Sequence, residues 1–162
     1  MTAAVVTVSD SAARGERADL SGPATVDLLR QQGFEVTIQR IVADDQTAIE
    51  ELLVELVEQV QLVVTTGGTG IGERDVTPEA TRAVCSKLVA GIPEKMRADG
   101  LAKTRFAILS RGVCGVCGRT LILNLPGSPK GAVESLRSVM HILPHAVDLL
   151  AGKTGHGEDS PE

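Results

Sequence analysis

The stretch that decides the fold spans residues 62–79 and reads Leu62-Val63-Val64-Thr65-Thr66-Gly67-Gly68-Thr69-Gly70-Ile71-Gly72-Glu73-Arg74-Asp75-Val76-Thr77-Pro78-Glu79. It opens with a short β-branched apolar run, which predicts a buried strand. It then breaks into glycines and resumes at Thr77-Pro78, where a threonine N-cap and a proline at the first helical position predict a helix start. A strand, a glycine turn and a helix start aim successive backbone N–H groups at one point, and such a point suits an anion.

Asp75 lies inside this stretch without an evident structural role, because Thr77 is expected to cap the helix. Asp75 would have a functional role instead if its carboxylate bound a divalent cation that also contacts a bound phosphate. The alternative, that Asp75 orders the loop by accepting a hydrogen bond, stays open. The glycine turn matches neither the Walker A motif nor the Rossmann G-x-G-x-x-G spacing, and by itself it is most often ordinary turn chemistry.

The length of 162 residues fits one domain, which we expect over residues 1–151, followed by a flexible C-terminal tail over 152–162. The net charge of −5 argues against a nucleic-acid or membrane-surface partner. Only Phe34 and Phe106 are aromatic, so stacking platforms for single-stranded nucleic acid are missing. A phosphate ligand would therefore need local positive features, such as helix N-termini, a metal, or the side chains of Arg14, Arg74, Arg111 or Lys130.

Features that the sequence lacks predict the cellular compartment of the protein. No stretch approaches the length of a transmembrane helix, and the chain runs from Met1 into a strand-like segment without a signal peptide. Together with the small number of cysteines, three, this predicts a reducing, cytoplasmic setting.

Apolar runs and helical stripes alternate along the chain and predict an α/β fold, a three-layer αβα sandwich around a largely parallel sheet. Strands are expected at 3–8, 35–42, 62–66, 106–111 and 120–125, with a loop at 112–118. Helices are expected to begin at Ser21, after Asp44-Asp45, at Pro78, near residue 94 and at Pro129, while Pro144 interrupts a last apolar stretch that ends at Leu150.

Polar motifs follow the predicted strands at their carboxyl ends, which is where ligands bind in such sheets. These motifs are Ser9-Asp10, Asp44, Gly67-Gly68, Ser110 and Pro126-Gly127-Ser128. One of the two acids Asp44 and Asp45 should cap the following helix, and only one cap is needed. The convergence of these motifs predicts a ligand cleft along one edge of the sheet.

The complete string from the glycine turn onward resembles the signature of a known family. GGTG at 67–70, followed by RDVTPEAT at 74–81, is similar to molybdopterin adenylyltransferases of the MogA/MoaB type, which include the plant and animal G domains. ILNLPGSPKGA at 122–132 and the pair Ser110-Arg111 match the same family. The resemblance covers nearly the whole chain.

This resemblance implies a MogA/MoaB-like fold and a role in molybdenum cofactor biosynthesis. The implied reaction is Mg²⁺-dependent adenylyl transfer from ATP to molybdopterin, which yields adenylyl-molybdopterin and pyrophosphate. Relatives in this family are usually trimers, so a homotrimer is expected, with other proteins of molybdenum cofactor biosynthesis as candidate partners.

The resemblance also implies site residues. Asp44 and Asp75 would be catalytic and would hold Mg²⁺, directly or through water, although this chain has Ala43 and Asp45 where the family has a Pro-Asp-Glu-like motif. The nucleotide would be bound by Gly67, Gly68, Thr69 and Gly70. Other substrate contacts would come from Ser9, Asp10, Ser110, Arg111, Pro126, Gly127 and Ser128.

Other interpretations stay open beside this one. The main alternative is a non-catalytic molybdopterin-binding or scaffold protein of the same fold, although retention of both Asp44 and Asp75 favours the enzyme. A nucleotide hydrolase of the kind attached to competence-damage proteins is less favoured, because the match extends through LPGSPKG. Cys114 and Cys117 have the spacing of a zinc or redox pair, but without further ligands nearby we interpret them as incidental loop thiols.

Overall fold

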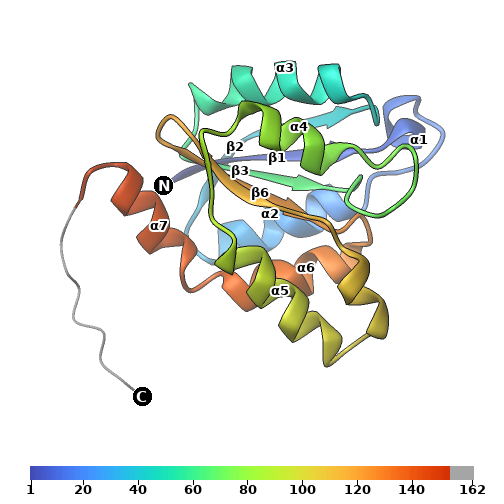
Figure 1. Ribbon diagram of the computed structural model, residues 1–162. Coiled ribbons are helices and arrows are strands. Elements are labelled where there is room, and N and C mark those ends of the chain that lie inside the picture. The colour runs from blue at the N-terminus through green and yellow to red at the C-terminus, as the bar shows by residue number, and fades with distance from the viewer. Residues whose placement is uncertain (154–162) are drawn as a thin grey trace.

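The computed structural model describes residues 1–153, in which strands and helices alternate (Figure 1). The strands are β1 (Thr2–Val8), β2 (Glu35–Val42), β3 (Leu62–Thr66), β4 (Lys87–Leu88), β5 (Cys114–Cys117) and β6 (Thr120–Leu125). The helices are α1 (Asp10–Ala13), α2 (Ser21–Gln31), α3 (Gln46–Val57), α4 (Thr77–Val84), α5 (Gly91–Leu101), α6 (Pro129–Val139) and α7 (Leu143–Leu150), and a 3-10 helix, η1, spans Arg105–Leu109.

The strands form one sheet in the order β2-β1-β3-β6-β5-β4. β1 pairs in parallel with β2 and β3, and β3 pairs in parallel with β6. β5 runs antiparallel to β6, and β4 runs antiparallel to β5. In Figure 1, α3 and α4 cover one face of the sheet, whereas α2, α5 and α6 cover the other. The predicted three-layer αβα sandwich around a largely parallel sheet is confirmed.

Each face of the sheet has its own apolar core. Along β1 the side chains alternate, so that Ala3 and Val5 belong to the cluster that includes α2 and α6, while Ala4 and Val6 belong to the cluster that includes α3. All four residues are at most 1% exposed. Because helices bury both faces, this strand reads in the sequence as a continuous apolar run rather than as an alternating one.

The predicted strands at 3–8, 35–42, 62–66 and 120–125 are confirmed, but the antiparallel edge of the sheet is not what the sequence pattern predicts. The strand predicted at 106–111 is wrong, because this segment forms η1 and leaves Phe106 and Ile108 62% and 65% exposed. The loop predicted at 112–118 is also wrong, because β5 lies there and pairs with β6. Pairing with neighbouring strands, rather than the apolar content of the segment, decides where β5 forms.

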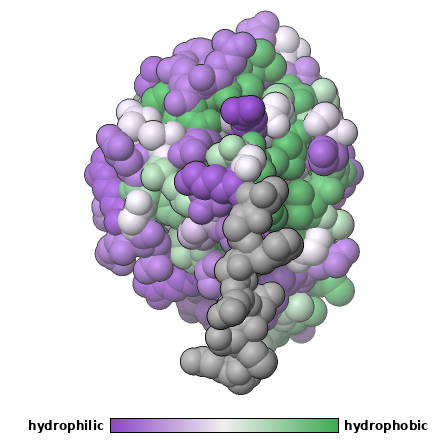
Figure 2. Space-filling model, turned by 90° about the vertical axis from the view of Figure 1, so that its left-hand side faces the viewer, coloured by the Kyte–Doolittle hydropathy of each residue, from purple (hydrophilic) through white to green (hydrophobic). Residues whose placement is uncertain are grey.

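The last helix packs one side on the core and exposes the other. Pro144 lies in the first turn of α7, where proline is tolerated, so it begins this helix rather than interrupting it. Leu143 and Val147 are buried, whereas Ile142 and Leu149 are 39% and 51% exposed. Figure 2 shows this side of the molecule, where apolar surface lies beside hydrophilic surface.

The first two residues of the predicted C-terminal tail are hydrogen-bonded to α7. The backbone N–H groups of Gly152 and Lys153 donate to Leu149 and Asp148 of α7, each at 3.0 Å. The remainder of the predicted tail, residues 154–162, lies outside the described residues, and the domain bounds 1–151 stay a prediction. Between residues 1 and 153, no helix combines the length and the apolar character needed to span a membrane.

Candidate functional site

A first cavity lies beyond the carboxyl ends of β1 and β3. The chain leaves β1 for β2 on one side of it and then crosses to β3 on the other side. Such a change of winding direction leaves a crevice beyond the strand ends. The cavity has a volume of about 430 Å³ and is lined by the end of β1, the loop before α2, Asp44, the glycine turn and the start of α6.

A second cavity, of about 550 Å³, lies between the glycine turn, α5, η1 and the start of α6. Its lining combines apolar side chains and a few hydroxyl groups with the cationic side chain of Arg97. The apolar and hydroxyl-bearing residues include Pro93, Met96, Phe106, Leu109, Thr104 and Ser110. Four residues line both cavities: Gly68, Asp75, Gly127 and Ser128. Two ligands, one in each cavity, would therefore meet beside Asp75.

The glycine turn is held tightly against its neighbours. Gly67 and Gly68 have φ values of 98° and 65°, in the left-handed region that favours glycine. A Cβ atom on Gly67 would lie 2.3 Å from the carbonyl oxygen of Val8, and one on Gly68 would lie 2.3 Å from Thr77 Oγ1. The conformation of this turn therefore needs glycine at both positions.

Thr77 anchors this turn instead of capping α4. Its hydroxyl donates to the Gly67 carbonyl at 2.9 Å, and its backbone N–H donates to the Gly68 carbonyl at 3.1 Å. The N-cap position of α4 is Val76, without a side-chain hydrogen bond. The predicted threonine cap is therefore wrong, because the hydroxyl is directed back to the turn, whereas Pro78 does lie in the first turn of the helix.

Asp75 orders the loop and also faces both cavities, so its structural role does not exclude the predicted role in binding a cation. Its Oδ2 accepts a hydrogen bond from the Gly72 N–H at 2.8 Å, so it does order the loop. It also lines both cavities. None of the described residues donates a hydrogen bond to its Oδ1, so this oxygen is available for a ligand.

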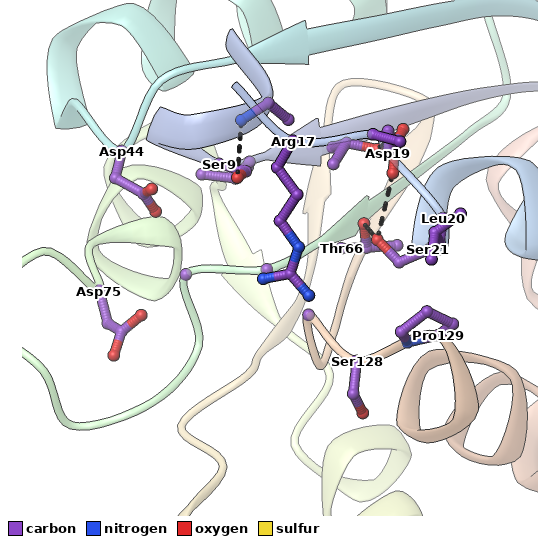
Figure 3. Close-up of a pocket in the computed structure, with 17 residues that line it drawn as sticks. Ser9, Arg17, Asp19, Leu20, Ser21, Asp44, Thr66, Asp75, Ser128 and Pro129 are labelled. Carbon is purple, nitrogen blue, oxygen red and sulfur yellow. Dashed lines mark hydrogen bonds between the residues drawn. The ribbon is translucent and has the colours of Figure 1, made fainter. Parts of the chain in front are cut away.

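Asp44 faces the first cavity because its neighbour has taken the capping role. Asp45 accepts the Ala48 N–H at 2.8 Å and caps α3. Asp44 instead exchanges hydrogen bonds with Asp10: each backbone N–H donates to the other carboxylate, at 2.8 and 3.0 Å. Figure 3 shows Asp44 and Asp75 on the same side of the cavity.

The pKa values of Asp44 and Asp10, which contact each other, are shifted in opposite directions. Burial raises the pKa of Asp44, and the negative charges of Asp10 and Asp75 raise it further, against the hydrogen bond from Asp10. For Asp10, desolvation alone would raise the pKa, but the hydrogen bond from Asp44 and the ion pair with Arg74 lower it overall. Asp44 is thus a carboxylate whose negative charge is not neutralised by a direct ion pair.

The arginines singled out in the sequence are engaged away from the cavities. Arg74 forms two hydrogen bonds of 3.0 Å with Asp10, and neither residue lines either of the two cavities. Arg14 pairs with Glu16. For Asp10, a substrate contact stays a prediction, and its observed contacts join the ends of β1 and β2.

Arg111 joins both ends of the loop that carries Asp75. Its Nε donates to the Gly70 carbonyl and its Nη2 to the Asp75 carbonyl, both at 2.7 Å, while Nη1 pairs with Glu79. Its backbone N–H donates to the Thr69 carbonyl at 2.8 Å. The ion pair raises the pKa of Arg111 and lowers that of Glu79. Arg111 lines neither of the two cavities, so its contacts are with the loop.

The other predicted site residues lie around the cavities. Ser9 and Pro126 line the first and the second cavity, respectively, and Ser110 lines the second although it follows η1 and not a strand. Ser9 and Ser128 also cap α1 and α6 by accepting the N–H groups of Ala12 and Gly131. Eleven of the thirteen predicted site residues thus line one or both cavities, whereas Asp10 and Arg111 line neither of the two.

The comparison with known proteins agrees with this geometry. The family described as "Probable molybdopterin binding domain" matches residues 4–145, a range that includes the residues lining both cavities. The molybdopterin adenylyltransferase of Helicobacter pylori strain J99 is 43% identical over 153 residues, which are 91% of this chain and 86% of that protein. The chain belongs to the molybdopterin adenylyltransferase family.

Other relatives of this adenylyltransferase family cover similar shares of the chain. The molybdopterin adenylyltransferase of Escherichia coli strain K12 is 38% identical over an alignment of 175 positions, gaps included, that covers 98% of this chain and 88% of that protein. The crystal structure of the molybdopterin biosynthesis enzyme MoaB from Thermus thermophilus matches with a TM-score of 0.89 at 49% identity, covering 94% of this chain and 97% of that one. The predicted family and MogA/MoaB-like fold are confirmed.

One lining residue of this family member was missed at the sequence level. Arg17 lines the first cavity, and its side chain extends into it (Figure 3). The segment Arg14-Gly15-Glu16-Arg17 reads as a charged surface loop, and Arg14 was the arginine of this loop expected to bind phosphate. The sequence does contain a signal for this. Only one acid, Glu16, lies between Arg14 and Arg17, and it can neutralise only one of the two arginines.

All three cysteines, Cys85, Cys114 and Cys117, are free thiols in the described part of the chain. Cys114 lies on β5 rather than in a loop, and burial raises its pKa to about 12. Burial also raises the pKa of Cys85 to about 11. These thiols are protonated at neutral pH and are poor nucleophiles. Residues 1–153 contain no group of three or more His, Cys, Asp and Glu side chains arranged to hold a metal.

Proposed function

We propose that this chain transfers the adenylyl group of ATP to molybdopterin in molybdenum cofactor biosynthesis. An oxygen of the terminal phosphate of molybdopterin attacks the α-phosphorus of ATP, and a new P–O bond forms. The bond from the α-phosphorus to the oxygen that bridges to the β-phosphorus breaks, and pyrophosphate leaves with the electron pair. A phosphate monoester is largely ionised at neutral pH, so the attack needs no general base.

The observation that carries this proposal is the shared wall of the two cavities. Gly68, Asp75, Gly127 and Ser128 line both of them, so two ligands bound side by side would have their ends within reach of each other there. Phosphoryl transfer depends chiefly on in-line positioning and charge stabilisation. Two adjoining cavities with one common wall provide the positioning that a two-substrate transfer requires.

The lining of each cavity supports an assignment of the substrates. The second cavity has apolar walls from Met96 and Phe106 beside the hydroxyl groups of Thr104 and Ser110, which suits a flat heterocycle with polar edges such as a pterin. The first cavity would take ATP. The backbone N–H groups of Gly68, Thr69 and Gly70 would then bind the phosphates that lie at the common wall, whereas the Gly67 N–H already donates to the Leu125 carbonyl at 3.1 Å.

Two of the three carboxylates that line the first cavity, Asp44 and Asp75, fit a magnesium ion that arrives with the nucleotide. Protein sites commonly bind Mg²⁺ through one or two carboxylates and complete its coordination with substrate phosphates and water. Asp44 and Asp75 line the same cavity, and both carry oxygen atoms that no arginine neutralises. Bound there, Mg²⁺ would supply charge neutralisation for the triphosphate. The chain's own residues hold the ion near the common wall and order the loop around it.

The test is an assay of purified protein with ATP, Mg²⁺ and molybdopterin, read out as adenylyl-molybdopterin and pyrophosphate. We expect turnover that stops when Mg²⁺ is removed with a chelator. In the variant Asp75→Asn we expect turnover to fall by at least about a hundredfold, while molybdopterin affinity is retained or raised, because a negative charge beside an anionic ligand is lost. Molybdopterin binding without any adenylylation by the wild-type protein would favour the scaffold function instead.

The quaternary structure and the compartment follow from the family and are proposals as well. We propose a cytoplasmic homotrimer that exchanges its pterin with other proteins of molybdenum cofactor biosynthesis. Analytical ultracentrifugation would show a species of three times the chain mass of 16.9 kDa.

A further inference from the structure

The first cavity contains a cation that the fold does not use. Figure 3 shows the Arg17 side chain reaching into this cavity, with its guanidinium between Asp75 on one side and Ser128 on the other. Among the described residues that line the cavity, Arg17 alone has a cationic side chain. Its guanidinium forms no ion pair with an acid of residues 1–153.

The acids next to Arg17 in the sequence are already occupied. Glu16 accepts two hydrogen bonds from Arg14, at 2.9 and 3.0 Å. Asp19 accepts the hydroxyl of Thr7 at 2.6 Å and a backbone N–H at the start of α2 at 2.9 Å. The charge of Arg17 is therefore available to a ligand.

The backbone around Arg17 is anchored. The N–H groups of Glu16 and Arg17 both donate to the Ser11 carbonyl, at 2.9 and 3.3 Å, and the N–H of Gly15 donates to Ala12 at 3.0 Å. These bonds fold the loop back onto α1. They fix the point from which the Arg17 side chain enters the cavity.

We propose that Arg17 binds the β- and γ-phosphoryl groups of the nucleotide and the pyrophosphate that leaves. A triphosphate entering a cavity lined by three carboxylates, Asp19, Asp44 and Asp75, needs more positive charge than one divalent cation supplies. A guanidinium fork binds phosphate oxygens in pairs. Arg17 lines the first cavity and not the second, so it serves the nucleotide and not the pterin. The identity of the nucleotide rests on the proposed function.

The experiment is a calorimetric titration of the full chain with inorganic pyrophosphate and Mg²⁺. We expect Arg17→Gln to weaken pyrophosphate binding by about tenfold to a hundredfold, and Arg17→Lys to restore part of the loss, because lysine keeps the charge without the fork. In the adenylylation assay Arg17→Gln should raise the KM for ATP and leave molybdopterin affinity unchanged. Thermal stability should also be unchanged, since Arg17 is exposed and unpaired within the described chain.

Arg14→Gln is the matched control, because it removes the same charge from the same loop while Arg14 is held by Glu16 outside the cavity. It should bind pyrophosphate like the wild type. Equal losses of pyrophosphate affinity in the two variants would indicate a general effect of the charge of the loop rather than a specific contact by Arg17, and would overturn the proposal. Wild-type affinity in Arg17→Gln, or no binding by the wild type, would overturn it directly.

These outcomes separate this inference from the proposed function. If the wild type binds pyrophosphate through Arg17 but does not adenylylate molybdopterin, the proposed function fails and the role of Arg17 in binding an oligophosphate stands. If the wild type adenylylates molybdopterin and Arg17→Gln binds pyrophosphate equally well, only the assignment of Arg17 fails.

Discussion

Asp44 and Asp45 are neighbours in the sequence with opposite roles in the structure. Asp45 caps α3 with a hydrogen bond of 2.8 Å to the Ala48 N–H. Asp44 points to the first cavity, and burial together with the charges of Asp10 and Asp75 raises its pKa. A carboxyl group that is harder to ionise in the folded state favours folding when it is protonated, and this contribution is lost as the pH rises through the raised pKa. At neutral pH the ionised carboxylate of Asp44 therefore destabilises the unliganded fold, and a cation bound there as proposed would offset this effect.

Asp44→Asn tests this trade-off. We expect adenylylation to fall by at least about a hundredfold, while the free energy of unfolding of the unliganded protein rises at neutral pH. Because Asp44 is partly exposed and solvent screens its charge, the gain should stay below about 1 kcal/mol. It should shrink as the pH falls through the raised pKa of Asp44, where the wild-type carboxyl becomes neutral. Urea unfolding across a series of pH values measures it.

The control for this prediction is Asp45→Asn, which removes the same charge one residue away. Asparagine is as good an N-cap as aspartate, so α3 should keep its cap and activity should persist. If Asp44→Asn instead lowers the free energy of unfolding at neutral pH, the contacts of the carboxylate stabilise the fold by more than the burial of its charge destabilises it.

At the scale of elements, the loop between β3 and α4 is held from outside by the segment after η1. Arg111 bridges the carbonyl groups of Gly70 and Asp75, and Glu79 fixes the guanidinium. Thr77 holds the other side of the turn through Gly67 and Gly68. Asp75 therefore keeps its position because Arg111, from a distant segment, and Thr77, at the start of α4, hold the two sides of the loop that carries it.

Arg111→Lys should release this clamp, because a lysine ammonium cannot bridge two carbonyl groups and a carboxylate as the guanidinium does. We expect kcat to fall by about tenfold to a hundredfold, with little change in the KM for molybdopterin. Hydrogen exchange of the amides at 70–76 should accelerate, while exchange in the sheet stays as in the wild type. Arg111 is a positioning residue in this view.

Arg82→Gln serves as the comparison, since Arg82 lies on α4 near Glu79 and makes no hydrogen bond to the loop among the described residues. Its kcat and loop exchange should match the wild type. If Arg111→Lys raises the KM for molybdopterin and leaves loop exchange unchanged, Arg111 contacts the substrate instead, as the family resemblance implied.

At the scale of the whole molecule, one buried polar residue joins the layers behind the site. Asn124 of β6 is 1% exposed. Its Nδ2 donates to the hydroxyls of Thr65 on β3 and Thr81 on α4, at 3.0 and 2.9 Å, and its Oδ1 accepts the Val113 N–H at 3.2 Å. A single amide thus links the central strands, a covering helix and the segment that leads into β5.

Asn124→Ala should lower the free energy of unfolding by about 2–4 kcal/mol, because it creates a cavity and leaves buried donors and acceptors without partners. Denaturant unfolding measures the loss. Thr37→Ala, at an exposed position of β2, should change stability by less than about 0.5 kcal/mol. A loss of under about 1 kcal/mol in Asn124→Ala would mean that water or rearranged side chains replace its bonds.

Much of the fold was predictable because its signals are local. The central parallel strands β1, β3 and β6 are largely apolar runs, since both of their faces are buried, and the helices α4 and α6 that follow site motifs have proline in their first turn. The glycine turn and the two acids were placed at one edge of the sheet because parallel strands bring their carboxyl ends together. The antiparallel edge was not predictable, since β4 and β5 form by pairing with a strand already present.

The sequence by itself therefore determined the layered α/β fold, the family and the edge of the sheet where the site lies. Only the tertiary structure decided how the charges are distributed: Arg14, Arg74 and Arg111 are each neutralised by an acid, and Arg17 is left in the cavity. The physical reason is one of range. Backbone conformation and burial follow from a residue's near neighbours, whereas the partner of a long charged side chain depends on which distant groups the fold brings within a few ångströms of it.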